Sequence, residues 1–156
     1  MPLTDFHNKI VALQKFSAAQ TVADIINENG GYISDLLRRQ LRSGIDGSGE
    51  PITLRRKGGV YPFYADSTVR LKEFKGQETG YITFHDSGTF YSSIYVFASG
   101  DSFLLDSDVP YFPDILLSSG SGDKIMELTQ ENLQLLSNEI IKPQFEIAFN
   151  LAFNGL

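Results

Sequence analysis

The apolar residues of positions 3–28 recur every three to four residues, which is typical of a helix with one buried face. The stripe comprises Phe6, Ile10, Leu13 and Phe16, and it continues less regularly through Val22, Ile25 and Ile26. Gly30 and Gly31 follow, and glycine permits the left-handed turn in which many helices end. We therefore predict one helix over residues 3–28 that stops at this glycine pair.

A second amphipathic helix is predicted over residues 32–43. Its apolar side consists of Ile33, Leu36, Leu37 and Leu41. The opposite side carries most of the positive charge, on Arg38, Arg39 and Arg42. Gly44 is the expected end of this helix.

Residues 44–66 follow neither the helical nor the strand period, and they begin with the stretch GIDGSGEPI. A long connection without structure of its own is uncommon in a compact domain and is usually functional or mobile. We interpret the segment as an extended arm or loop that leaves the helix at a pivot, with a short strand or hairpin around residues 52–56 closed by KGG. The pivot and arm residues are Gly44, Asp46, Gly47, Gly49, Pro51, Gly58 and Gly59.

Alternation of apolar and polar residues over positions 68–106 predicts antiparallel strands. The four segments are TVRLKEF, GYITFH, TFYSSIYVFA and DSFLLDS. The short turn SGD joins the last two, so we expect them to form a hairpin. A short helical piece near residues 115–117 and a flexible turn at SSGSGD come next.

The C-terminal segment predicts a helix from the N-cap Thr129 to about Asn154, with a kink at Pro143. Phe145, Phe149 and Phe153 are four residues apart and form one apolar stripe, which Leu151 widens. A helix this apolar is either a core helix or a subunit contact. One helix serves both purposes if the phenylalanines face inward and Leu151 faces outward.

Together these elements predict a single domain over residues 1–156 with an α+β fold. N-terminal helices precede an antiparallel sheet of about four strands, and the C-terminal helix packs on that sheet. The chain has no cysteine, which excludes disulfides, thiolate zinc sites and cysteine nucleophiles. No apolar run approaches the roughly 20 residues of a membrane span, and the first residues lack the pattern of a signal peptide. We expect a protein that folds without export and has no membrane contact.

The net charge of −6 is unevenly distributed. Residues 38–75 hold nine of the thirteen basic side chains, whereas residues 76–156 hold eleven acidic ones and only two lysines. Such a division fits contact with nucleic acid, pairing between the basic part of one copy and the acidic part of another, or a solvated mixed surface. The candidate contacts with DNA or an acidic partner are Arg38, Arg39, Arg42, Arg55, Arg56 and Lys57.

Known patterns for metal, phosphate and covalent chemistry do not fit the chain. The loop at Asp46 lacks the bidentate Glu of a calcium loop, and no phosphate-binding glycine motif is present. His85, Asp86 and Ser87 are adjacent, and adjacent side chains cannot converge as a triad. We therefore expect no catalytic residue, metal or cofactor. A small hydrolase that uses the carboxylates between Asp101 and Asp114 stays open as an alternative.

The order of these parts resembles the small tail-completion and neck proteins of tailed bacteriophages, a family that includes the virion-morphogenesis protein of Mu-like phages. The likeness covers most of residues 32–142. The matching residues are Arg38, Arg39, Asp46, Gly49, Thr68, Lys72, Gly76, Asp86, Ser87, Gly88, Phe90, Ser93, Leu128, Thr129, Glu131 and Asn132. The chain departs from the family pattern at Ser87, where threonine is usual, and in a longer segment over residues 50–65.

The resemblance implies a structural virion protein without catalysis, located at the neck or the tail end and assembled in the host cytoplasm. It implies closed rings of about six or twelve copies around the DNA channel. The implied partners are further copies, other neck, portal or tail proteins and, non-specifically, phage DNA. A small nucleic-acid-binding module that uses residues 38–75 is the alternative.

Overall fold

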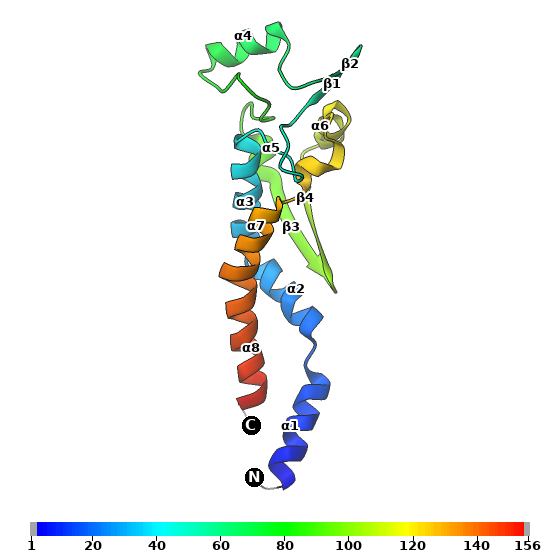
Figure 1. Cartoon of the computed structure of the whole chain (residues 1–156), viewed down its shortest axis with the longest axis vertical. Helices are drawn as coiled ribbons and strands as arrows, with labels where there is room; N and C mark the ends of the chain where they lie inside the picture. The colour runs from blue at the N-terminus through cyan, green and yellow to red at the C-terminus, as the bar shows by residue number, and fades with distance from the viewer. Residues whose placement is uncertain (1–2, 155–156) are drawn as a thin grey trace.

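The computed structural model describes residues 3–154, and the side chains of two predicted stripe residues, Phe6 and Leu13, lie outside that description. The elements are strung along one long axis (Figure 1). One end consists of helix α1 (Leu3–Lys15) and the last turns of helix α8 (Lys142–Asn154). The other end carries helix α4 (Asp66–Phe74) and a small hairpin of strands β1 (Leu54–Arg56) and β2 (Gly59–Tyr61).

The N-terminal segment forms two helices, so the prediction of one continuous helix over residues 3–28 is wrong. Helix α1 ends at Lys15, and α2 (Ala18–Glu28) begins after Ser17. Ser17 has an extended backbone, and its hydroxyl accepts a hydrogen bond from the Gln20 N–H at 3.2 Å. A serine in this position satisfies a free N–H of the first turn, so it starts a new helix where the apolar stripe alone indicates none.

Helix α3 (Gly30–Arg42) confirms the second predicted helix, but Gly30 and Gly31 are its first residues instead of a stop signal. Asn29 closes α2 through its N–H to the Ile25 carbonyl at 3.1 Å. A Cβ on Gly30 would lie 3.0 Å from Val96 Cγ1. A larger residue would press on Val96, so the glycine favours the close approach of α3 to a strand, and it does not adopt a left-handed backbone conformation.

Two of the four predicted strands are absent from the described residues. The segment TVRLKEF lies in helix α4, and residues 80–85 form an irregular connection. Gly76 ends α4 with φ of 64°, and the Gln77 N–H bonds to the Lys72 carbonyl at 2.9 Å. This left-handed glycine cap is the signal that the strand interpretation overlooked.

The predicted hairpin is confirmed as strands β3 (Ile94–Ser99) and β4 (Ser102–Ser107). Its register pairs Phe97 with Leu104. The strand prediction is wrong for TFYSS, the first half of TFYSSIYVFA, which forms the short helix α5 (Thr89–Ser93). The described part of the chain thus contains two separate two-stranded antiparallel sheets in place of one four-stranded sheet. The α+β class itself is confirmed.

The second half continues with helix α6 (Phe112–Ser118), the 3₁₀ turn η1 (Gly122–Met126) and helix α7 (Gln130–Leu135). Thr129 is confirmed as an N-cap, because its hydroxyl accepts from the Asn132 N–H at 3.3 Å. A π-helical segment, η2 (Leu136–Ile141), joins α7 to α8 and ends two residues before Pro143. Proline lacks an N–H and crowds the preceding turn, and the wider π turn accommodates it.

The core lies between the inner face of the β3–β4 ribbon and helices α2 and α3, and η1 and η2 complete it. Helix α8 packs on α1 and α2, so the prediction that it packs on the sheet is wrong. The fully buried side chains include Ile33, Leu36, Leu37, Leu41, Ile52, Ile82, Ile125 and Leu136.

Candidate functional site

Arg38, the first of the candidate DNA contacts, forms hydrogen bonds and an ion pair within the chain. Its Nε donates to the Tyr91 carbonyl at 2.7 Å, and Nη2 donates to the Ile94 carbonyl at 3.1 Å. Nη1 pairs with Asp35 at 2.7 Å. The guanidinium therefore ties α3 to the point where α5 becomes β3, and its donors are used within the chain.

Arg42 and Arg39 differ in whether the guanidinium contacts an aromatic ring. The Arg42 guanidinium lies over the Tyr91 ring, 5.4 Å from its centroid, in a cation–π contact. Burial raises the pKa of the Tyr91 phenol, which donates to the Thr83 carbonyl at 2.7 Å. Arg39 is exposed, and its one hydrogen bond runs to the carbonyl of Asp35 at 3.4 Å.

The hairpin β1–β2 presents its basic residues in two ways. Arg56 stacks over Tyr61 at 4.4 Å and over Phe63 at 5.4 Å, and it donates to the Phe63 carbonyl at 3.1 Å. Arg55 and Lys57 are exposed. Of the six candidate contacts, Arg39, Arg55 and Lys57 are therefore exposed without an aromatic partner among the described residues, and the nucleic-acid alternative for residues 38–75 stays a prediction.

The GIDGSGEPI stretch, residues 44–52, forms a closed loop held at both ends. The buried Asp46 carboxylate accepts from the Ser48 N–H at 2.9 Å, and Ile45 and Pro51 form an antiparallel bridge. The Gly47 N–H bonds to the Lys124 carbonyl at 2.8 Å. Positive φ angles occur at Gly44, Gly49, Gly58 and Gly59.

This loop is anchored on η1, and the projecting part of the predicted arm is the hairpin that follows it (Figure 1). A Cβ on Gly47 would lie 2.4 Å from Glu127 Cβ, so glycine is needed there for contact with the body. The proposed pivot at Gly44–Gly49 stays a prediction.

Lys72 is a buried lysine. In the sequence it was named only as one of the residues that match the phage family pattern. Its Nζ donates to the His85 carbonyl at 2.6 Å and to Gln77 Oε1 at 3.3 Å, and it lies 4.8 Å from the Tyr64 ring centroid. Buried cations are retained where such hydrogen-bond acceptors and aromatic rings replace water. Lys72 therefore fastens α4 to the irregular segment 77–86.

The exposed side of α4 was missed because its sequence was interpreted as a strand. Phe74 is 91% exposed and Leu71 is 62% exposed, although both are large apolar side chains. Asp66 in the first turn and Gly76 after the last are the signals that would have predicted the helix.

His85, Asp86 and Ser87 have different neighbours and do not converge. The His85 ring packs edge-on against Tyr91 at 5.3 Å, and Asp86 pairs with Lys75. The Ser87 hydroxyl lies 2.8 Å from that of Thr89. Lys75 lowers the pKa of the Asp86 carboxyl through its hydrogen bond.

The carboxylates between Asp101 and Asp114 are mostly at the surface. Asp106 accepts from the Ser107 N–H at 2.8 Å and the Tyr95 hydroxyl at 3.3 Å, and its charge raises the pKa of Tyr95. Asp101, Asp108 and Asp114 are exposed. The described residues contain no group of three His, Cys, Asp or Glu side chains placed to hold a metal ion.

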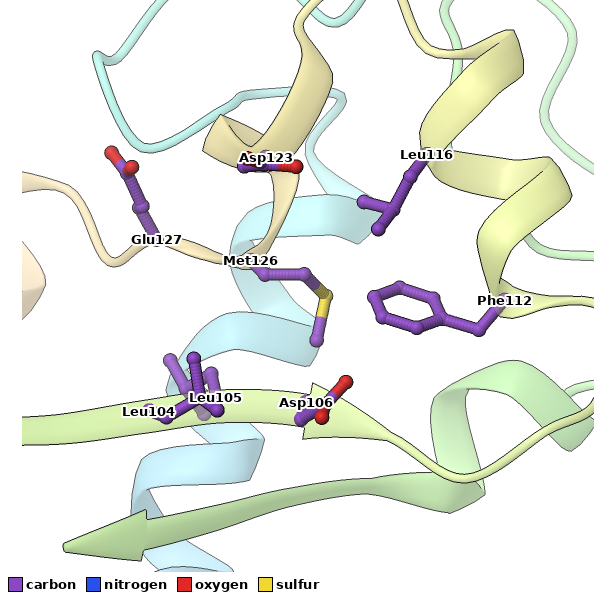
Figure 2. A pocket seen from close by; sticks show the side chains of 8 residues that line it. All are labelled: Leu104, Leu105, Asp106, Phe112, Leu116, Asp123, Met126 and Glu127. Atoms are coloured by element: carbon purple, nitrogen blue, oxygen red, sulfur yellow. The ribbon is translucent and has the colours of Figure 1, made fainter.

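The structure adds a groove between β4 and the η1–α7 segment. Its first part, about 270 Å³, is lined by Leu104, Leu105, Phe112, Leu116 and Met126, with Asp106, Asp123 and Glu127 around it (Figure 2). A second part of about 460 Å³ continues toward Leu133 and shares the β4 residues. Sequence reasoning did not single out Asp123 or Glu127, because the chain segments that form the groove meet only in the fold.

The phenylalanine stripe of α8 faces α1. Phe16 packs edge-on against Phe145 at 5.8 Å and Phe149 at 5.6 Å, and Phe149 lies 4.5 Å from Phe153. On the outer side, Leu151 is 69% exposed. The phenylalanines thus lie on the side of Phe16, although Phe149 stays 38% exposed, and Leu151 lies on the outer side. The subunit-contact role of this helix stays a prediction.

Comparisons with protein-family models, curated proteins and solved structures give no match to this chain. The resemblance to phage neck and tail-completion proteins therefore depends on the order of the motifs alone. Among residues 3–154, no helix combines the length and apolar character that a membrane span requires.

Proposed function

We propose that this chain is a structural subunit of a tailed-bacteriophage particle that acts by joining neighbouring proteins at the neck or tail end. In this proposal it forms a ring with further copies and contacts other neck, portal or tail proteins. It performs no covalent chemistry and needs no cofactor.

The observation that carries the proposal is the distribution of exposed apolar side chains over projecting elements. Phe74 on α4 is 91% exposed, Leu117 on α6 is 73% exposed and Leu151 on α8 is 69% exposed. Phe74 and Leu151 each have a second exposed apolar residue one helical turn away, Leu71 (62%) and Ile147 (60%), and such contiguous exposed apolar surface favours a protein–protein contact. Because these residues lie on separate elements along the molecule (Figure 1), they suit a subunit with several neighbours.

The roles of the motif residues also support an assembly protein. Arg38 and Lys72 bridge elements, Gly76 and Gly88 adopt positive φ at helix ends, and Thr129 caps α7. Each of these residues fixes the relative positions of elements. Residues with these roles keep the surface of the chain in one shape, which neighbouring proteins can bind.

The test uses particles of the encoding phage prepared without this chain. We expect purified chain to bind these particles and restore the joining of heads to tails, seen by electron microscopy. Leu151→Asp should bind more weakly, whereas its exposed neighbour variant Asn150→Asp should bind like the unaltered chain. A chain that stays monomeric and does not bind the particles would contradict the proposal.

A further inference from the structure

The two outer edges of the β3–β4 ribbon differ in whether their backbone groups have hydrogen-bond partners. On β3, Asn27 of α2 accepts from the Ala98 N–H at 2.8 Å and donates to the Ala98 carbonyl at 3.0 Å. Arg38 covers the Ile94 carbonyl. Two side chains thus occupy outward backbone groups at both ends of this edge, where an additional strand would have to pair.

The edge of β4 is open. Because both backbone groups of Ala98 point away from β4, the antiparallel pattern makes its partner Phe103 point away from β3. Leu105, two residues on, points the same way. In the described part of the chain neither residue has a hydrogen bond on that side, and unpaired strand edges are templates for another strand.

This open edge is one wall of the groove described above. Leu105 of β4 lies across it from Met126 and Phe112, and Leu104 borders it from the opposite, exposed face of the strand. Asp123 and Glu127 lie on the far side (Figure 2). A segment that fits would be extended, partly apolar and positively charged.

The hairpin β1–β2 has these properties. Its outer β1 edge is occupied, since the Gly120 N–H bonds to the Thr53 carbonyl at 2.8 Å and Leu54 forms a bridge with Ser119. Its β2 edge is open among the described residues. Arg56 and Gly59 flank the two-residue turn as a hydrogen-bonded pair, so the backbone groups of the next pair, Arg55 and Val60, point outward. Val60 is 52% exposed, and Arg55 and Lys57 add positive charge.

We propose that strand β2 of a second copy of this chain adds to the open edge of β4. The basic hairpin tip would then lie beside Asp123 and Glu127, and the two small sheets would join into one four-stranded sheet across the contact. Main-chain hydrogen bonds would supply affinity, and the opposite charges would fix the register. The inference builds on the assembly role proposed above and names the surfaces that join one copy to the next.

The contact uses different surfaces on the two copies, so it is heterologous. Each copy keeps one free hairpin and one free groove after the first contact. Such contacts build a ring if the rotation closes and a filament if it does not.

The test exploits the charge complementarity. The first variant, Arg55→Glu with Lys57→Glu, carries an acidic hairpin and the natural acidic groove. The second, Asp123→Lys with Glu127→Lys, carries a basic groove and the natural basic hairpin. We expect the unaltered chain to self-associate in analytical ultracentrifugation, each variant alone to be monomeric, and an equal mixture of the two to associate again.

Restored association in the mixture cannot arise from misfolded variants, so it would establish the contact. Association of either variant alone to the same extent as the unaltered chain would overturn the inference, as would a monomeric unaltered chain or a mixture that stays monomeric. If the chain joins phage particles but the charge variants join them equally well, the inference fails while the proposed function stands.

A second variant tests the strand edge without changing charge. Val60→Pro removes an outward N–H and leaves the hairpin's own ladder intact. We expect it to lose association, whereas Val60→Thr keeps it. Equal association of the two variants would contradict strand addition.

Discussion

The central body and the paired terminal helices bury their apolar residues to different extents. In the body, Ile33 and Leu37 of α3 are 0% exposed beneath the β3–β4 ribbon. In the terminal pair, Phe149 is 38% exposed and Ile147 is 60% exposed, although α8 is one of the most apolar segments of the chain. The body buries a complete layer of apolar residues between helices and ribbon, although Phe97 and Leu104 on the outer face of the ribbon are 60% and 58% exposed, whereas the terminal helices bury only one side of theirs.

This difference separates residues that stabilise the fold from residues that are available to partners. Stability comes mainly from apolar area removed from water. The body therefore supplies most of it, while α1 and α8 are held together by the ring contacts of Phe16 with Phe145 and Phe149. Substitutions in the two regions test this division, beginning with the largest expected effect, and a substitution in an exposed ion pair has the smallest.

Leu37→Ala should lower the free energy of unfolding by about 2–5 kcal/mol, because it leaves a cavity at a fully buried position. Leu151→Ala, on the exposed side of α8, should change it by less than about 0.5 kcal/mol. Urea denaturation followed by circular dichroism measures both. Similar losses for the two variants would show that the terminal helices are part of the core.

Gln40→Ala should cost about 1–3 kcal/mol, since it leaves buried polar groups without partners. The side chain is 6% exposed, accepts from the Thr129 N–H and Asn132 Nδ2 at 2.9 Å each, and donates to the Glu127 carbonyl at 2.8 Å. The exposed Gln134→Ala on α7 is the matched control in the same denaturation experiment. A loss no larger than that of the control would mean that α7 is held to α3 by other contacts.

Phe16→Ala should loosen the terminal pair without unfolding the body. Each aromatic pair contributes about 1 kcal/mol beyond its buried area, and Phe16 makes two. Hydrogen exchange should therefore become faster in α1 and α8 and stay unchanged in α3. Gln14→Ala, exposed on α1, should change neither, and faster exchange in α3 would refute the independence of the two regions.

Asp86→Asn should have the smallest effect and a defined pH dependence. Lys75 lowers the pKa of Asp86 below its ordinary value of 3.8, so the ion pair stabilises the folded chain above that pH. The contribution is lost as the pH falls through the lower, folded-state pKa. The difference in melting temperature between the two chains should thus be small at neutral pH, because the pair is exposed, and absent in strong acid; a difference that grows in acid would contradict this origin.

The sequence predicted the elements whose signals are local. The stripe of α3, the turn between β3 and β4 and the Thr129 cap each depend on residues a few positions apart, so they were recognisable without the fold. The segment TVRLKEF was misassigned because a short alternating run fits a strand as well as a helix surface. The break at Ser17 was missed because the apolar stripe runs across it.

The sites that join distant segments were not predictable from the sequence. Arg38 was expected at a DNA surface, yet its donors are taken by carbonyls more than fifty residues away. The groove was not predictable for the same reason, since the segments that line it, β4, η1 and α7, meet only after folding.

The sequence alone determined helix α3, the β3–β4 hairpin, the Thr129 cap, the division into basic and acidic parts and the absence of cysteine chemistry, because these depend on residue type and short spacing. Only the tertiary structure decided which arginines are free, which strand edge is covered and which side of α8 faces water. Those properties depend on which distant groups become neighbours, and the free energy of burial and hydrogen bonding fixes that only when the whole chain has folded.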